Sequence, residues 1–400
     1  MKVAIVTVLY KRMIDDFYTH HADATSLSYE AHKELFDSDM SFWASGWARA
    51  LRKRGYEVLT ITINASELLN QWARENTVAS RESRTIALEQ IVRFKPDILW
   101  YDYFDVALLR QIKDSVPSLR ATIGWSGSAI VNFDVFREVR FVLSCAPEVV
   151  QRLNDHGLAA YHLHHAFDPA VLDSIEMRTK SIGLSFVGQI VRGGQYHGKR
   201  EQLLRQLSRE CDLSIFSTSS QYDTKDILLI PVLQLAYMVV QPVHWLRIEH
   251  FFSRFERFRK LLDLRELPGF PYDRALKPSL KPPVFGTRMF QCLADSQVVL
   301  NVHADSSPRF ASNMRLFETT GIGSCLLTDR KENISQLFEE NTEIVTYESI
   351  DDCIEKARWL AQHSSEAGRI AQQGQIRTLR DHTFDVRSEK LINYFERALQ

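Results

Sequence analysis

The sequence has little excess charge of either sign and few cysteines. Its 400 residues include 49 lysines and arginines and 50 aspartates and glutamates, so the formal net charge is −1. This balance argues against nucleic acid as a partner and requires any anion site to be local. The five cysteines lie far apart and lack metal-ligand spacing. They are typical of buried thiols in a reducing compartment, so we expect a cytoplasmic protein.

Two common phosphate-binding motifs are also absent. The sequence contains neither G-x-G-x-x-G after a strand nor the Walker motif G-x-x-x-x-G-K-[ST]. A dinucleotide oxidoreductase and a P-loop phosphotransferase are therefore poorly supported. A nucleotide could still bind through backbone amides at helix N-termini and a few charged side chains.

Apolar strands alternate with amphipathic helices, which is the pattern of parallel sheets covered on both faces. We predict two Rossmann-like domains, 1–172 and 173–385, facing a cleft, and a final helix over 386–400 that could return to the first domain. Such tandem units bind ligands at the carboxyl ends of their strands. The expected strands are 2–9, 56–63, 97–102, 119–125, 139–145, 159–167, 184–190, 212–217, 295–304 and 343–347. The expected helices are 41–54, 82–94, 105–115, 147–155, 198–211, 350–361, 364–378 and 384–399.

The segment NMRLFETTGIGSCLLTD (313–329) combines a short helix with charged residues. If Asn313 or the serine before it caps this helix, free amides lie beside Arg315, and Glu318 follows about one turn later. A carboxylate suits the paired hydroxyls of a ribose, whereas arginine and amides suit a diphosphate. The alternative is an ordinary ion pair between Arg315 and Glu318 on a solvated helix.

The run PVFGTRMFQCLADSQVVLNVH (283–303), followed by SNMRLFETTG, LLTDRKEN, LFE and EIVTYES, resembles the glycosyltransferases related to the spore maturation protein CgeB. The similarity continues through RDHTF, with weaker matches at SFVGQ and HAFDP. The resemblance implies the GT-B fold and a nucleotide-sugar donor. It implies that Glu318 binds the donor ribose and that Arg315 lies near the donor phosphates. The retaining GT-B signature has a second glutamate eight positions earlier. Here that position is Phe310, which leaves inversion or retention open.

Four further residues are candidates for donor binding. Gly286, before an expected helix, could let the backbone approach the base or the phosphates, or could only form a turn. His303, at the end of a strand, could contact phosphate or sugar, or could be a hydrogen-bonded structural histidine. Lys199 and Arg200 could neutralise a leaving diphosphate, or could begin a solvated helix.

The candidates for catalysis lie in the first half of the chain. An inverting transfer needs a base within hydrogen-bond reach of the acceptor hydroxyl, and His20, His21, Asp23 and Asp102 follow expected strands. A retaining transfer could instead use the departing phosphate as the base. For each residue, a structural or solvated role is the alternative.

Asp37-Ser38-Asp39 has the form of the D-x-D metal-binding motif. No apolar strand precedes it, and it lies among residues of helical character. We interpret the three residues as helix-capping chemistry and expect neither a metal ion nor another cofactor.

Residues 219–280 do not fit a compact Rossmann half and form a predicted insertion. The apolar run 227–245 is interrupted by Pro231 and Pro242, which makes it a poor membrane span. Residues 246–262 have phenylalanines at helical spacing and several arginines. The stretch 227–262 could therefore lie on a membrane, at the inner face of the cell membrane, or hold a lipid-linked acceptor. The alternative is a helical hairpin packed on its own domain or on a dimer partner.

Taken together, these features predict a metal-independent, hexosyltransferase-like glycosyltransferase for cell-surface polysaccharide or glycoconjugate synthesis. Its partners would be a nucleotide sugar and a saccharide or lipid-linked acceptor. Two other functions remain open: a nucleotide-sugar 2-epimerase of GT-B architecture, and a catalytically silent GT-B scaffold that acts through the insertion 219–280.

Overall fold

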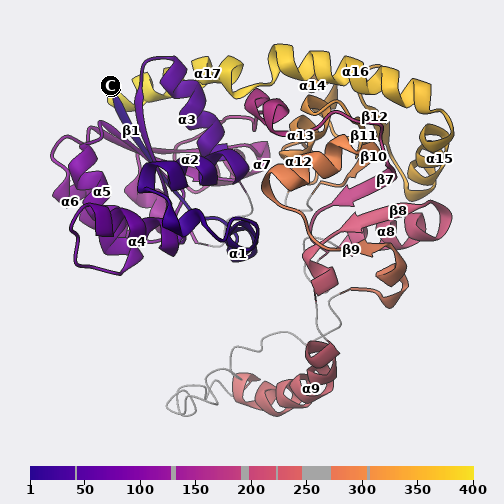
Figure 1. The fold of residues 1–400 in the computed structure, drawn as a ribbon, viewed down its shortest axis with the longest axis horizontal. Coiled ribbons are helices and arrows are strands. Elements are labelled where there is room, and N and C mark those ends of the chain that lie inside the picture. The colour runs from indigo at the N-terminus through magenta and orange to yellow at the C-terminus, as the bar shows by residue number, and fades with distance from the viewer. Residues whose placement is uncertain (41–42, 128–131, 191–197, 222–223, 246–271, 304–306) are drawn as a thin grey trace. The chain divides into compact units, whose positions relative to one another are not determined.

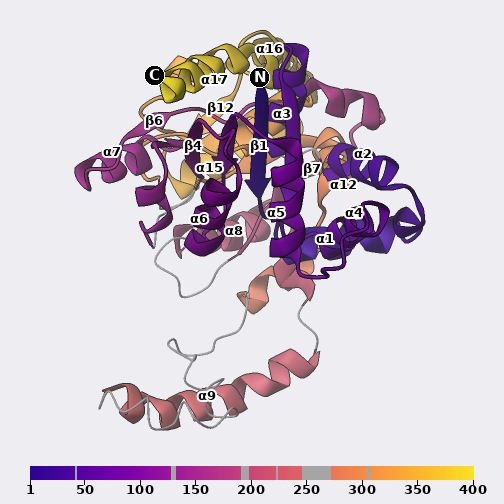
Figure 2. The same ribbon diagram turned by 90° about the vertical axis from the view of Figure 1, so that its left-hand side faces the viewer.

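The computed structural model describes residues 1–40, 43–127, 132–190, 198–221, 224–245, 272–303 and 307–400. These residues form two six-stranded sheets flanked by helices (Figures 1 and 2). Neighbouring strands run parallel, for example β1 with β2 and β10 with β11. The predicted α/β class with two parallel sheets is therefore confirmed.

The first sheet has the strand order β2-β1-β3-β4-β5-β6. Its strands are β1 (Lys2–Thr7), β2 (Glu57–Thr62), β3 (Ile98–Tyr101), β4 (Ala121–Ser126), β5 (Phe141–Ser144) and β6 (Ala160–His162). Its helices are α1 (Lys11–His20), α2 (Tyr29–Met40), α3 (Trp43–Lys53), α4 (Ser66–Glu75), α5 (Ser83–Phe94), α6 (Val106–Ser115) and α7 (Pro147–Asp155). The short 3₁₀ turns η1 (Ala24–Ser26), η2 (Val135–Glu138) and η3 (Pro169–Ser174) join them.

The first sheet is covered on both faces, as its sequence pattern predicts. Alternate residues of β1 enter different clusters: Val3 and Ile5 pack on one face, and Ala4 and Val6 on the other. All four side chains are fully buried. This explains why the strand is a continuous apolar run and does not alternate with polar residues.

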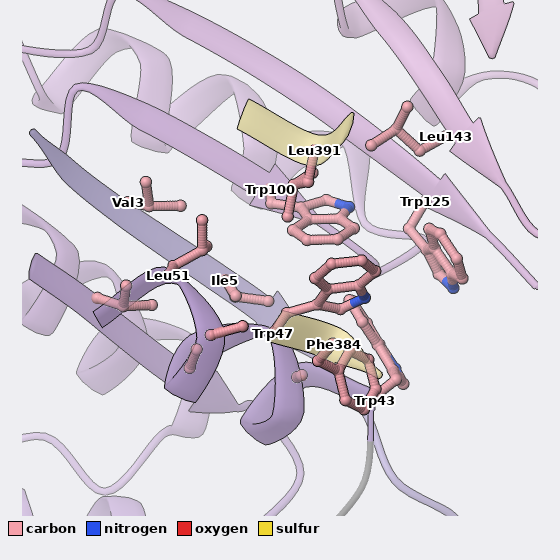
Figure 3. Packing of buried hydrophobic residues seen from close by; sticks show 14 of the residues in the cluster. Val3, Ile5, Trp43, Trp47, Leu51, Trp100, Trp125, Leu143, Phe384 and Leu391 are labelled. Atoms are coloured by element: carbon pink, nitrogen blue, oxygen red, sulfur yellow. The ribbon is translucent and has the colours of Figure 1, made fainter. Parts of the chain in front are cut away.

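Tryptophans dominate one face of this sheet (Figure 3). Trp43 stacks on Trp125 with their ring centroids 5.2 Å apart, and Trp47 meets Phe384 edge to face at 4.9 Å. Phe384 opens α17 (Phe384–Leu399), which also contributes Leu391 to the cluster. The C-terminal helix therefore completes the core of the first sheet.

The second sheet has the strand order β12-β11-β10-β7-β8-β9. Its strands are β7 (Ile182–Val187), β8 (Leu213–Phe216), β9 (Leu280–Lys281), β10 (Ser296–Asn301), β11 (Cys325–Asp329) and β12 (Val345–Tyr347). The helices of this half are α8 (Gly198–Glu210), α9 (Thr224–Trp245), α12 (Gly286–Ala294), α13 (Arg315–Gly321), α14 (Ile334–Leu337), α15 (Ile350–Gln362) and α16 (Ser364–Asp381), with 3₁₀ turns η4 (Thr218–Gln221) and η5 (Arg274–Ser279). In Figure 1, α16 and α17 (yellow) continue from this half to the first sheet.

The chain divides into two compact units, residues 1–184 with 284–400, and residues 185–283. The predicted domain limits at 172 and 385 stay a prediction. Part of the predicted insertion 219–280 is the helix α9, in the second unit, whereas the expected amphipathic helix over 246–262 lies outside the described residues. Within the described ranges, no helix combines the length and the apolar character that crossing a membrane requires.

Candidate functional site

Polar side chains link the carboxyl ends of β10 and β11 to the start of α13. Asn301, the last residue of β10, accepts a hydrogen bond from the Asn313 amide at 2.7 Å. It donates to the hydroxyl of Thr328 in β11 at 2.9 Å. These bonds hold Asn313, a predicted donor-site residue, just before α13. In the second sheet, the strand order reverses where β10 lies beside β7, and ligands of α/β proteins bind outside carboxyl ends at such a point.

His303 lies at the same edge and is held by Asp329, the last residue of β11. Its Nδ1 and its backbone N–H both donate to Asp329 Oδ1, at 2.7 and 3.0 Å. The carboxylate also pairs with Lys331 at 3.0 Å. Despite burial, the His303 ring and the Lys331 ammonium hold the pKa of Asp329 below its usual range.

His303 Nε2 is a buried nitrogen at this edge for which the described residues provide no hydrogen-bond partner. The His303 side chain is only 1% exposed. Since the Asp329 carboxylate can only accept, Nδ1 carries a proton, and Nε2 is the ring nitrogen left for a further contact. A buried polar atom without a partner is costly, so this nitrogen suggests a ligand contact.

Arg315 and Glu318 form the ion pair that their spacing predicts. Arg315 Nη1 lies 2.8 Å from Glu318 Oε2, and the same nitrogen lies 3.2 Å from the sulfur of Met289 in α12. The ion pair of the alternative interpretation is therefore present, but the side chains are only 16% and 8% exposed, so the pair does not lie on a solvated helix face. Burial raises the pKa of Glu318, and the Arg315 charge opposes this shift.

Asp102 follows β3 at the corresponding edge of the first sheet. The chain forms β1 and β2 on one side and then β3 on the other, so the order reverses between β1 and β3. The hydroxyl of Thr7, at the end of β1, donates to Asp102 Oδ2 at 2.9 Å. Burial raises the pKa of Asp102 to about 7, although the Thr7 hydrogen bond lowers it. This value suits a general base near neutral pH.

The other three catalytic candidates have contacts of their own. His20 ends α1 and bonds the carbonyl of Asp16 through Nδ1 at 2.8 Å. His21 Nε2 lies 3.5 Å from Asp39 Oδ2. Asp23 is exposed, and its carbonyl accepts from the backbone N–H of Ser26 at 2.9 Å, which closes a 3₁₀ turn. Within the described chain, no hydrogen bond joins these residues to Asp102.

Gly286 packs against protein at the start of α12. Its φ is +54°, and a Cβ there would lie 2.6 Å from the carbonyl oxygen of Asp39. The Thr287 hydroxyl donates to the same carbonyl at 3.2 Å, and Arg288 pairs with Asp16. The glycine therefore permits a close approach between α12 and α2.

The helix-capping interpretation of the D-x-D residues is wrong. Asp37 and Asp39 lie in the last turn of α2, where Asp37 pairs with Lys33 and accepts from Thr60 at 3.3 Å. Their side chains contact residues within α2 and outside it, and neither aspartate lies at the start of a helix. The described residues contain no cluster of three or more metal-ligating side chains, and metal independence stays a prediction.

Lys199 and Arg200 belong to α8, in the second unit. Arg200 donates to the carbonyl of Gln189 at 3.1 Å, and its guanidinium lies 5.8 Å from the ring centre of Phe186. The side chain of Lys199 lies outside the described part of the structure. Their predicted role toward a diphosphate stays a prediction.

Glu148, which was not among the predicted site residues, joins the edges of the two sheets. Glu148, in the first turn of α7, accepts from the Ser307 hydroxyl at 2.8 Å and from the backbone N–H groups of Arg309 and Phe310 at 3.0 and 3.1 Å. The loop it binds follows β10 and precedes α13. An acidic residue after Pro147 signals only a helix start, so no sequence feature predicts this long-range contact.

The arrangement defines the class of fold. Two six-stranded parallel sheets flanked by helices are the architecture of the GT-B fold. Solved structures with this fold align over almost the whole chain. A glycosyltransferase from Rickettsia africae ESF-5 has 8% identity and a TM-score of 0.51, covering 100% of this chain and 98% of its own.

Two further structures give the same result. HepE from Anabaena, solved with UDP and glucose, has 10% identity and a TM-score of 0.50, covering 99% of both chains. Sucrose-phosphate synthase from Thermosynechococcus elongatus has 8% identity and a TM-score of 0.51, covering 99% of this chain and 98% of its own. At these identities the likeness establishes the fold alone.

The sequence of the second half is similar to one particular family. Residues 247–393 match the family described as "Glycosyl transferase-like". This stretch contains α12, α13 and the edge with His303 and Glu318. No curated protein matches the sequence. The narrower CgeB-like assignment stays a prediction.

Proposed function

We propose that this protein is a metal-independent glycosyltransferase that moves a sugar, such as a hexose, from a nucleotide-sugar donor to a hydroxyl group of a saccharide or lipid-linked glycan. The observation that carries the proposal is the buried Arg315–Glu318 pair at the start of α13, beside the carboxyl ends of β10 and β11. The Glu318 carboxylate would bind the ribose hydroxyls. Arg315 and the first amides of the helix would bind the diphosphate. The process served would be polysaccharide or glycoconjugate synthesis.

Asp102 is the base that we propose for an inverting transfer, because burial raises its pKa to about 7. The acceptor oxygen would attack the anomeric carbon while the bond from that carbon to the diphosphate oxygen breaks. The nucleoside diphosphate would leave with the bonding electrons, and the acceptor proton would pass to the Asp102 carboxylate. A retaining transfer would instead use the leaving phosphate as the base.

His303 is proposed to contact the donor through Nε2. A ligand hydrogen bond to this nitrogen would remove the cost of leaving it unpaired in the buried site. If the contact is to the sugar, His303→Ala would weaken binding of the nucleotide sugar and leave binding of the nucleotide alone unchanged.

The proposal is tested by titrating the protein with UDP, GDP, dTDP, ADP and CMP while following its thermal transition. UDP is the first choice because HepE, which shares the fold, was solved with it. We expect one nucleotide to raise the transition temperature of the wild type. Glu318→Gln should weaken its binding about tenfold or more, since a charged hydrogen bond to the ribose is lost.

A matched control is available in α16. Glu366 and Arg369 form an ion pair with the same i,i+3 spacing, at 2.6 Å, but their side chains are 36% and 47% exposed. Glu366→Gln should leave nucleotide binding unchanged. The proposal fails if no nucleotide binds the wild type, which would favour a scaffold. Conversion of the nucleotide sugar without an acceptor would instead reveal an epimerase.

A further inference from the structure

The helix α9 exposes a stripe of large apolar side chains. Leu228, Val232, Leu235 and Val239 are 69%, 58%, 61% and 68% exposed. Their i, i+4, i+7, i+11 spacing places them on one face of the helix. We call these four residues the α9 stripe; the helix is labelled in Figures 1 and 2. A soluble helix normally buries such a face, so the stripe requires an apolar partner.

The residues beside the α9 stripe indicate what kind of partner this is. Leu229 and Leu233 on one side and Met238 on the other are also exposed, by 51%, 37% and 56%. A helix that pairs with another protein helix usually has a narrow apolar seam flanked by charged side chains. From 227 to 243 the sequence has no Asp, Glu, Lys or Arg. A wide apolar surface without flanking charge fits lipid better than a second copy of this chain.

The charge of the neighbouring sequence agrees with this assignment. Residues 246–265 contain six Lys or Arg against three Asp or Glu, together with four phenylalanines. An apolar helix next to a basic, aromatic-rich sequence complements an anionic bilayer surface. We infer that the α9 stripe docks on an anionic membrane surface. The helix would lie in the interface, where a lipid-linked acceptor would also be found.

Vesicle flotation of the full chain tests the inference. The vesicles are phosphatidylcholine alone and equal parts of phosphatidylcholine and phosphatidylglycerol. We expect the wild type to float with the mixed vesicles and less with phosphatidylcholine alone. Leu235→Glu with Val239→Glu should reduce flotation about tenfold or more, because two apolar side chains leave the interface.

Two comparisons keep the result specific. Ile376→Glu with Val386→Glu changes two helix residues that are 49% and 45% exposed elsewhere, and should float like the wild type. The wild type with vesicles of phosphatidylcholine alone is the second comparison, and it should float less than with the mixed vesicles. The inference fails if the wild type does not float, or if the stripe variant floats equally well. It also fails if light scattering shows a dimer that the stripe substitutions dissociate without any vesicle binding.

Discussion

Two opposing influences act on the carboxyl group of Asp102. Burial disfavours its charged form and raises its pKa to about 7, while the hydroxyl of Thr7 donates to the charged form and lowers it. The result is a carboxyl group that exchanges a proton near neutral pH. Carboxyl groups with such perturbed pKa values cluster at sites where an acid or a base acts.

Asp102→Asn should lower the rate of sugar transfer by about 10²- to 10⁴-fold and leave nucleotide binding unchanged, because it removes a general base. In the wild type, kcat/KM should fall as the pH drops below about 7, where Asp102 becomes protonated. The measurement is release of nucleoside diphosphate as a function of pH.

Thr7→Val provides the directional control for this prediction. Removing the hydroxyl takes away the influence that lowers the pKa of Asp102, so the acidic limb of the profile of kcat/KM against pH should move to higher pH.

Folding stability adds a second readout. The folded state holds the Asp102 proton more tightly than the unfolded chain does. The stability that the protonated carboxyl contributes is therefore lost as the pH rises from about 4 to about 7. Asp102→Asn should therefore be more stable than the wild type at pH 8. An active variant with the wild-type pH profile would exclude Asp102 as the base.

Residue-level prediction from the sequence worked where the interaction is local. The spacing of Arg315 and Glu318 predicts their pair because they lie on the same helix, one turn apart. The burial of that pair depends on α12 and the sheet, which no local pattern encodes. The partnership of His303 with Asp329 was missed for the same reason, since the residues are 26 positions apart and meet only through strand pairing.

At the level of elements, the start of α12 packs closely against α2. Gly286 combines a positive φ with a carbonyl oxygen only 2.6 Å from the place of a Cβ. Gly286→Ala should therefore lower the free energy of unfolding by about 1–3 kcal/mol. Gly368, within α16, has open space at its Cβ position. Gly368→Ala should instead stabilise by up to about 1 kcal/mol. Urea denaturation measures both, and equal effects at the two sites would contradict the packing argument.

The contact between α7 and the loop before α13 leads to a prediction about catalysis. Glu148 accepts three hydrogen bonds from residues 307–310. Glu148→Gln replaces an accepting oxygen with a donating amide, so at least one bond is lost, at a cost of about 1.5–3 kcal/mol. We expect kcat/KM to fall about tenfold, because this loop leads into the donor-site helix.

Glu332→Gln is the control for this contact. Glu332 pairs with the side chain of Arg309 in the same loop at 2.8 Å, but both partners are more than half exposed. Exposed pairs contribute less than about 1 kcal/mol, so this variant should resemble the wild type in kcat/KM and in thermal stability. Equal losses in the two variants would show that the loop is merely sensitive to charge.

Strands were easier to predict than the helices beside them. Short apolar runs bounded by turns predicted β1 to β5 to within about two residues at each end, since both faces of that sheet are buried, whereas the run 159–167 extends well beyond β6. The helices α1, α2 and α4 were not predicted. Their packing includes polar groups: His32 bonds Tyr18 at 3.1 Å and Gln71 at 2.7 Å. A buried histidine and glutamine interrupt the apolar period that would signal these helices.

At the scale of the whole molecule, the connection between the two sheets is built around histidines. His162, the last residue of β6, and His164 meet edge to face with their ring centroids 4.1 Å apart. His382, before α17, donates to the carbonyl of Leu337 at 2.8 Å and accepts from Arg387 through Nδ1 at 2.8 Å. The guanidinium of Arg387 also lies 4.3 Å from the ring centre of Phe317. A protonated His382 would direct a second N–H toward a cation, so the cluster favours neutral rings.

This histidine cluster should make the fold sensitive to acid. Burial, with help from the Arg387 charge, lowers the pKa of His162 and of His382 to about 4 and that of His165 to about 3. The unfolded chain takes up these protons below about pH 6.5, whereas the folded state does not until about pH 4. Stability present above pH 6.5 should therefore be lost as the pH falls through this window. Calorimetry from pH 8 to pH 4 should show a falling transition temperature. The fall should be shallower in His382→Gln. His363→Gln alters an exposed histidine and should show the same fall as the wild type. If His382→Gln follows the wild-type curve, the acid sensitivity arises elsewhere.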